Sequence, residues 1–199
     1  MKRLIELANK IKDEKLRKQT IEILKNPKIS NKSMKYPAAD YSKTPAWPVG
    51  AHHDYEGGLI DHTCSVTKNA IDIANNLKKT YKAKINLDHL IAGALLHDIM
   101  KIFLMKKKGK TWDFTGCILD HADFSGCELY ARDFPEEVVH IVIAHGGEMG
   151  YTAATPRTIE ATLVSHCDMI DSSMESMINE KSELDQLKMM FMMPEEASD

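Results

Sequence analysis

Apolar residues recur at three- and four-residue spacing along most of the chain, which is the pattern of amphipathic helices. Asn86 is a candidate N-cap, and Pro135 and Thr155-Pro156 are helix-start signals. The sequence predicts helices over residues 1–25 (periodic from about 3), 59–81, 87–105, 118–131, 135–145, 155–171 and 172–193.

Two stretches lack this period. Residues 28–54 are rich in Pro, Ser and Asn and predict a long ordered loop, and residues 106–114 predict a hairpin that turns at Gly109. We therefore expect an all-α fold with one small hairpin, formed by a single domain over 1–199 with its core at about 37–171. The helix 1–25 and the methionine-rich helix 172–193 are expected to pack on this core. A homodimer through the methionine surface is the alternative for the last helix.

Composition and charge restrict the class of protein. The 199 residues are 43% hydrophobic and 28% charged, as in an ordinary soluble domain. A net charge of −3 predicts no broad basic surface for nucleic acid, although a short oligonucleotide held locally remains compatible. The N-terminus does not resemble a signal peptide, and no apolar stretch approaches the roughly 20 residues of a membrane span. We expect a cytoplasmic protein.

Histidines and carboxylates occur inside apolar helical patterns. His62 shares the stripe of Leu59 and Val66, so it points inward; alone, it is more often a hydrogen-bonded core residue. His97-Asp98 adds a carboxylate to an apolar helix, and burying it requires a partner or a cation. Lys101 is one such partner. Imidazole with carboxylate also suits a divalent ion such as Mn, Fe, Co, Ni or Zn.

The same residue types return later in the chain. Asp168 lies in another apolar helix, with Asp171 one turn on as an N-cap or a supporting group. His121 and His145 each lie near the end of a predicted helix. Five helices that all turn metal-ligand side chains toward one core are improbable by chance. The pattern therefore predicts a metal centre.

At this point the sequence resembles the HD superfamily of metal-dependent phosphohydrolases, over roughly residues 37–171. The motifs that carry the resemblance are Gly57-Gly58-Leu59-Ile60-Asp61-His62-Thr63, Leu95-Leu96-His97-Asp98-Ile99-Met100-Lys101, Asp120-His121, Ala144-His145-Gly146, and His166-Cys167-Asp168-Met169-Ile170-Asp171. Ala38-Ala39, His52-His53 and Tyr55 make it most similar to the HD domain of YhaM-type 3′–5′ exoribonucleases. Those proteins carry an OB-fold before the HD domain, and this chain is expected to begin almost at the HD domain. Met100 and Gly146 depart from the usual glycine and histidine.

The resemblance implies the roles of the ligands. It assigns His62, His97, Asp98 and Asp168 to a first divalent metal (Mn, Fe, Co, Ni, Zn or Mg). It makes Asp98 a bridge to a second metal held by His121 and His145. A metal-bound hydroxide then attacks the phosphorus of a phosphate ester.

Several residues near these motifs have two interpretations each. Lys101 contacts substrate phosphate or only pairs with Asp98. His52 and His53 bind phosphate or act as an acid, or they are solvated loop residues. Arg157 and Lys43 are further candidate phosphate contacts. The aromatic side chains of the long loop stack on a base or pin the loop to the core; these are Tyr36, Tyr41 and Trp47.

We therefore predict a metal-dependent phosphohydrolase that acts on phosphate esters of nucleotides or short single-stranded oligonucleotides. Phosphodiesterase or 3′–5′ exonuclease activity and nucleotidase activity both fit this class. The alternative is a catalytically silent, metal-stabilised HD module that binds a nucleotide or a protein partner.

Overall fold

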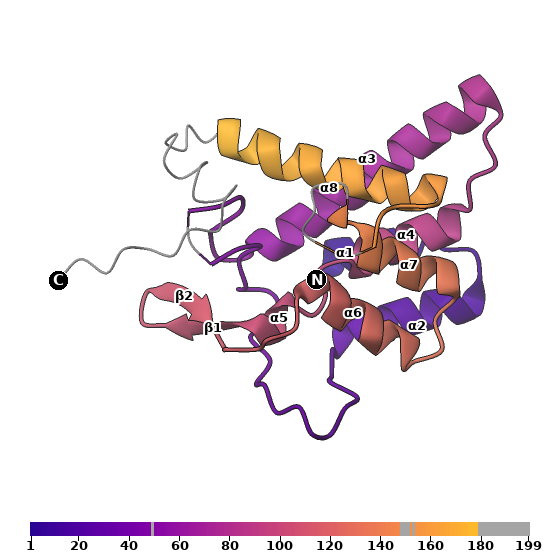
Figure 1. Cartoon of the computed structure of the whole chain (residues 1–199). Helices are drawn as coiled ribbons and strands as arrows, with labels where there is room; N and C mark the ends of the chain where they lie inside the picture. Colours follow the sequence, from indigo (N-terminus) through magenta and orange to yellow (C-terminus); the bar gives the residue numbers. More distant parts are fainter. Residues whose placement is uncertain (49, 148–151, 153, 179–199) are drawn as a thin grey trace.

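The computed structural model describes residues 1–48, 50–147, 152 and 154–178, and it is mostly helical (Figure 1). The all-α prediction with one small hairpin is confirmed. In chain order the elements are α1 Lys2–Ala8, α2 Glu14–Lys25, α3 Gly58–Tyr81, α4 Leu87–Leu96, α5 Lys101–Leu104, β1 Met105–Lys108, β2 Thr111–Phe114, α6 His121–Tyr130, α7 Glu136–Ala144 and α8 Ile159–Ile178.

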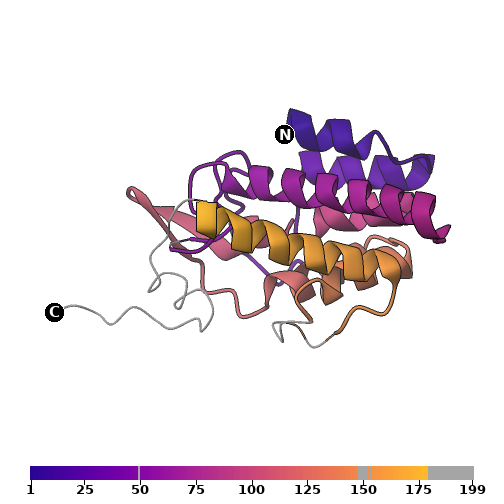
Figure 2. The ribbon, with the colours of Figure 1, turned by 90° about the horizontal axis from the view of Figure 1, so that it is seen from above.

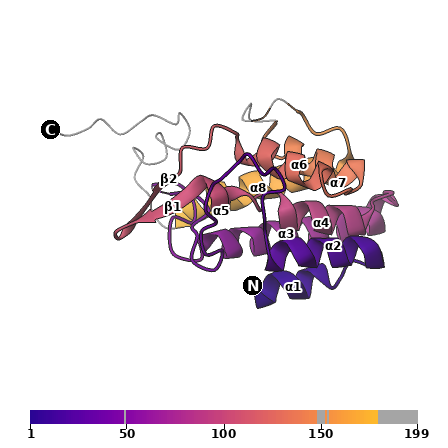
Figure 3. The same ribbon diagram turned by 90° about the horizontal axis from the view of Figure 1, so that it is seen from below.

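Helix α4 is the centre of the molecule. Every residue from Leu90 to Leu96 is buried, because α4 contacts α2, α3, α7 and α8 on its different sides. Seen from below, α1 and α2 lie on one side of α4, and α6 and α7 lie on the other (Figure 3). Helices α3 and α8 run side by side along the body (Figure 2). Segments that are distant in sequence thus meet around the end of α4.

The prediction of one N-terminal helix over 1–25 is wrong, since a turn separates α1 from α2. Asp13 caps α2 by accepting a hydrogen bond from the backbone N–H of Leu16. The Asp88 carboxylate of α4 accepts hydrogen bonds from the backbone N–H groups of Lys12 and Asp13. The turn is therefore held by a contact from elsewhere in the chain, which helical spacing does not reveal.

The predicted helix over 87–105 is also interrupted. Asn86 caps α4 as expected, but α4 ends at Leu96 and a turn leads into the short α5. Within that turn the backbone bonds span three residues, from Ile99 N–H to the carbonyl of Leu96 and from Lys101 N–H to that of Asp98. Apolar residues before, within and after the turn are all buried, such as Leu96, Ile99 and Ile102, so the apolar pattern continues across the turn and does not indicate it.

The hairpin is confirmed. Strands β1 and β2 pair antiparallel, with Met105 opposite Phe114 and Lys108 opposite Thr111. Gly109 supplies the positive φ of 62° that the tight turn requires. Because β1 follows α5 directly, the base of the hairpin is joined to the helix that begins at Lys101 (Figure 1).

Helix α8 begins later than predicted and does not stop at residue 171. The Thr158 hydroxyl accepts a hydrogen bond from Ala161 N–H, so the helix starts after Thr158 rather than at Thr155-Pro156. It continues to Ile178, with Met174 and Met177 exposed. The rest of the predicted helix 172–193 lies outside the described residues. No helix among the residues described is long and apolar enough to cross a membrane.

Candidate active site

The structure brings the predicted metal-ligand residues to one place. His62 lies in the N-terminal part of α3, and His97-Asp98 directly follows α4. The remaining members come from three later helices: His121 begins α6, His145 follows α7, and Asp168 lies in α8.

One half of this cluster surrounds the Nε2 atoms of His62 and His97, which are 3.2 Å apart. Asp98 Oδ2 lies 3.4 Å from each of these nitrogens. Asp168 Oδ1 lies 3.0 Å from His62 Nε2. Both histidines and Asp98 are almost completely buried. Two imidazoles and two carboxylates therefore face one small volume.

The other half surrounds His121 and His145, whose Nε2 atoms are 3.1 Å apart. Asp98 Oδ1 lies 3.4 Å from His121 Nε2 and 3.9 Å from His145 Nε2. Asp168 Oδ2 lies 4.0 Å from His145 Nε2. The two oxygens of Asp98 thus face different histidine pairs, and Asp98 stands between the two halves.

Two of the histidines are oriented by their own helices. His97 Nδ1 donates a hydrogen bond to the carbonyl of Ala94 at 2.8 Å, and His145 Nδ1 donates to the carbonyl of Val142 at 2.7 Å. A carbonyl oxygen can only accept, so each Nδ1 carries the proton. Each Nε2 therefore presents its lone pair to the cluster.

The other two histidines are oriented by carboxylates. His62 Nδ1 lies 2.8 Å from Asp171 Oδ2, so Asp171 is a supporting residue rather than an N-cap. His121 Nδ1 lies 3.2 Å from Asp120 Oδ2. Asp120 also caps α6 by accepting from Ala122 N–H. Asp120 was not among the predicted site residues, although an aspartate just before a predicted helix is an N-cap signal.

The donor set of the cluster fits divalent cations. In each pair the two Nε2 lone pairs face each other at close range and repel each other unless a positive charge lies between them. Both oxygens of Asp98 are buried; Oδ2 has the Lys101 ammonium beside it, and Oδ1 accepts no hydrogen bond from any described group. Groups of three ligands lie within 4.8 Å of one another on both sides of Asp98. Imidazole with carboxylate is a ligand set of divalent transition metals.

The electrostatics agree with this fit. Burial opposes a charge on His62, but hydrogen bonds with Asp168 and Asp171 raise its pKa well above the usual value. Burial also opposes ionisation of Asp98, yet the charge of Lys101 holds its pKa well below the usual value. The cluster therefore attracts positive charge to its centre. Bound cations can supply that charge in place of protons.

Lys101 pairs with Asp98, which is one of its two predicted roles. Its Nζ lies 2.7 Å from Asp98 Oδ2, and the lysine is buried. The same Nζ lies 5.3 Å from the centre of the Trp47 ring. The pairing leaves a positive charge fixed beside the cluster.

His52 and His53 are not solvated loop residues. His53 is buried, and its Nε2 lies 3.6 Å from Asp171 Oδ2. The ring centre of His52 lies 4.7 Å from that of His62. The loop is fixed here, because Ala46 N–H donates to the His53 carbonyl and a Cβ on Gly58 would lie only 2.1 Å from that oxygen. His53 itself has a positive φ of 50°, a conformation that costs energy and is common at functional sites.

Arg157 is not brought to this cluster. It is exposed just before α8, where its backbone N–H donates to His140 Nε2. It lines a pocket with Leu77, near the opposite end of α3 from His62. Lys43 is exposed on the long loop and makes no described contact with the ligand residues.

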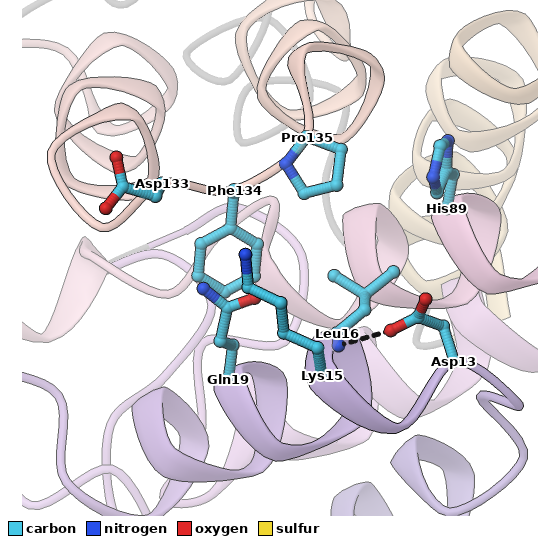
Figure 4. Close-up of a pocket in the computed structure, with 8 residues that line it drawn as sticks. All are labelled: Asp13, Lys15, Leu16, Gln19, His89, Asp133, Phe134 and Pro135. Atoms are coloured by element: carbon cyan, nitrogen blue, oxygen red, sulfur yellow. Dashed lines mark hydrogen bonds between the residues drawn. The ribbon is translucent and has the colours of Figure 1, made fainter.

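A further pocket, of about 290 Å³, also lies apart from the cluster. It is formed by α2, the start of α4 and the segment before α7, and Phe134 forms one of its walls (Figure 4). Its lining residues are Asp13, Lys15, Leu16, Gln19, His89, Asp133, Phe134 and Pro135. It shares no residue with the metal-ligand cluster, so the chemistry belongs to the end of α4.

Comparison with known proteins agrees with this geometry. The HD domain family profile matches residues 59–173. The chain is 46% identical to dihydroneopterin 2′,3′-cyclic phosphate phosphodiesterase of Methanocaldococcus jannaschii over 174 residues, which is 86% of this chain and 69% of that protein. It is 32% identical to the 3′-5′ exoribonuclease YhaM of Oceanobacillus iheyensis, covering 81% of this chain and 53% of the relative. YhaM of a Geobacillus strain is 26% identical, covering 87% and 52%.

The chain spans about half the length of these exoribonucleases. No solved structure matches it. The resemblance to YhaM is therefore present, at a lower identity than the resemblance to the phosphodiesterase. Because the profile covers more than half of the chain and its span includes the residues that converge in the structure, the protein belongs to the HD domain family of metal-dependent phosphohydrolases.

Proposed function

We propose that the protein is a phosphodiesterase that uses two divalent cations to hydrolyse phosphate esters of nucleotides or short single-stranded oligonucleotides. The observation that carries the proposal is the position of Asp98. Its two oxygens face two separate pairs of Nε2 atoms, which is the arrangement of a carboxylate shared between two ions.

The ligands divide between the two sites. We assign His62, His97 and Asp168 to one cation and His121 and His145 to the other, with Asp98 shared. Four imidazoles in the set favour Mn, Fe, Co, Ni or Zn over Mg, which prefers oxygen. Bound there, the cations acidify water and neutralise charge on the phosphoryl oxygens.

The surrounding side chains position the phosphate. Lys101 holds a positive charge beside Asp98, and this charge attracts the phosphoryl oxygens of a substrate. His52 and His53 lie on the His62 side of the cluster. Their Nδ1 atoms lie 3.3 Å apart and His53 Nε2 lies 3.6 Å from Asp171 Oδ2, so we assign the hydrogen bond to a phosphate to His52 Nε2. Arg157 is left out of this assignment because of its distance along α8 from Asp168.

The relatives support cleavage of phosphodiester bonds as the reaction class. One is named a cyclic phosphate phosphodiesterase and others are named exoribonucleases. Both names denote hydrolysis of a phosphodiester. We therefore place nucleotidase activity second to phosphodiesterase activity.

Hydrolysis of bis-p-nitrophenyl phosphate with added Mn²⁺ tests the proposal. We expect turnover by the wild type. Asp98→Ala should abolish turnover and release metal while helical content in circular dichroism is retained. Asp72→Ala, which removes an exposed carboxylate of α3, is the matched control and should keep both. If the metal-loaded wild type hydrolysed neither this ester nor a panel of nucleotides, a metal-stabilised binding module would replace the proposal.

The number of cations has its own test. His121→Ala removes one of the two imidazoles on its side of Asp98 and should reduce the metal content from two ions to one per chain in elemental analysis. His89→Ala, at the separate pocket beside α2, is the control and should retain both. An unchanged content in His121→Ala would contradict the two-ion assignment.

A further inference from the structure

An aromatic ring from the long loop stands next to the metal-ligand cluster. The ring centre of Trp47 lies 6.3 Å from that of His121, with the planes at 76°. The Lys101 ammonium lies 5.3 Å from the centre of the same ring. Trp47 therefore contacts both a ligand of the second cation and the lysine beside Asp98. Tyr41 of the same loop is instead buried in the core, so it anchors the loop.

A second aromatic ring extends this surface outward. Phe114 ends β2, and its ring centre lies 5.6 Å from that of Trp47 with the planes at 72°. The side chain of Phe114 is 47% exposed. The pairing of Phe114 with Met105 fixes its position, because Met105 directly follows α5. Two nearly perpendicular rings thus form a corner, one side of which is open.

The corner lies on the accessible side of the cluster. Among the described residues, His62 and His97 are completely buried, whereas the side chains of His121 and Asp168 are 13% and 22% exposed. A substrate therefore approaches from the side of His121 and Asp168. Trp47 borders this approach at His121, and Phe114 lies beyond Trp47.

We infer that Trp47 and Phe114 bind the planar heterocyclic ring of the substrate while its phosphate lies at the metal ligands. The inference rests on the proposed phosphodiesterase function and assigns the side chains that bind the heterocycle of its substrate. A planar ring that stacks on one of the two aromatic rings presents its edge to the other, and both contacts are favourable. Stacking accepts any base, so the surface selects for the presence of a ring rather than for its identity.

Tryptophan fluorescence tests the inference without catalysis. The chain has two tryptophans, and Trp112→Phe leaves Trp47 as the only one. In this variant, loaded with Zn²⁺, which is diamagnetic and does not itself quench tryptophan, AMP should quench the fluorescence of Trp47 with saturation. Ribose 5-phosphate has the same sugar and phosphate but no heterocycle, so it should bind more weakly in calorimetry.

The decisive variant is Phe114→Ala. Loss of one stacking partner should weaken AMP binding by about 5- to 150-fold. It should leave ribose 5-phosphate binding unchanged. Tyr81→Ala removes another exposed aromatic side chain, at the far end of α3, and should change neither.

Equal affinities for AMP and ribose 5-phosphate, or an unchanged AMP affinity in Phe114→Ala, would overturn the inference. The two proposals fail separately. Quenching by AMP in a protein that does not hydrolyse bis-p-nitrophenyl phosphate would refute the phosphodiesterase but retain the ring-binding surface. Hydrolysis of phosphodiesters together with equal binding of AMP and ribose 5-phosphate would retain the phosphodiesterase but refute the ring-binding surface.

Discussion

Asp171 offers a sharp test of how the metal centre is built, because it supports a ligand without facing the centre itself. Its Oδ2 lies 2.8 Å from His62 Nδ1 and 3.6 Å from His53 Nε2. Burial opposes its ionisation, but the hydrogen bond with His62 outweighs this and lowers the pKa of Asp171. The carboxylate is therefore charged at neutral pH, and it fixes both the orientation of His62 and the nitrogen that carries its proton.

The magnitude follows from that role. Removing a carboxylate that supports a ligating histidine costs about 10- to 100-fold in metal affinity. This corresponds to about 1.4–2.7 kcal/mol, which matches the roughly 1.5–3 kcal/mol of a hydrogen bond to a charged group. Asp171→Asn keeps an oxygen that can accept from Nδ1 but loses the charge, so it should lie near the lower limit. Asp171→Ala loses both and should lie near the upper limit.

The affinity for Mn²⁺ is measured by titration. The paramagnetic resonance signal distinguishes free Mn²⁺ from bound Mn²⁺ at each step. Circular dichroism of each variant checks that the helices are retained. Asp72→Ala is the control, since it removes an exposed carboxylate from α3 without a role at the site. An Asp171→Ala protein that folds and binds Mn²⁺ as tightly as the wild type would refute the reasoning.

Three further predictions concern the fold. Gly58→Ala places a Cβ 2.1 Å from the His53 carbonyl oxygen, so unfolding in urea should show a loss of about 1–3 kcal/mol; no loss would contradict the close approach. Leu95→Ala leaves a cavity at a fully buried position of α4 and should cost about 2–5 kcal/mol in the same assay, and a smaller loss would mean that the core collapses around it. Burial raises the pKa of the Tyr41 phenol, so the folded state keeps its proton above pH 10, where the unfolded chain loses it. The stability of the wild type should therefore fall more between pH 9 and 11 than that of Tyr41→Phe, and parallel curves would contradict this.

The spacing of apolar residues was enough to predict most of the helices, because α3 and α7 bury side chains at helical spacing and α4 buries every residue from Leu90 to Leu96. It did not predict the turns at 9–13 and 97–100. The first is held by Asp88, which lies far away in sequence, and the second is buried on both sides. Contacts between distant segments determine both turns, and a local sequence pattern does not indicate such contacts.

The candidate site, like the fold, could be predicted only in part from the sequence. Residue types such as His97 and Asp98 are costly in an apolar core, so the sequence alone marks them as candidates. The direction of each imidazole depends on an acceptor such as Ala94 or Asp120, and the corner at Phe114 depends on the pairing of two strands. Arg157 shows the converse. It was predicted as a candidate phosphate contact, but it precedes α8, and the first half of that helix separates it from Asp168.

The origin of the supporting contacts also makes the two halves of the centre unequal. His97 and His145 are aimed by carbonyls three residues earlier in the chain, so their geometry forms together with the end of each helix. His62 is aimed from α8, which also carries Asp168. Correct assembly of that half therefore requires α8 to dock along α3. Chelation should thus increase amide hydrogen exchange in α8 more than in α6 or α7, since ion binding and docking of this helix draw on the same free energy.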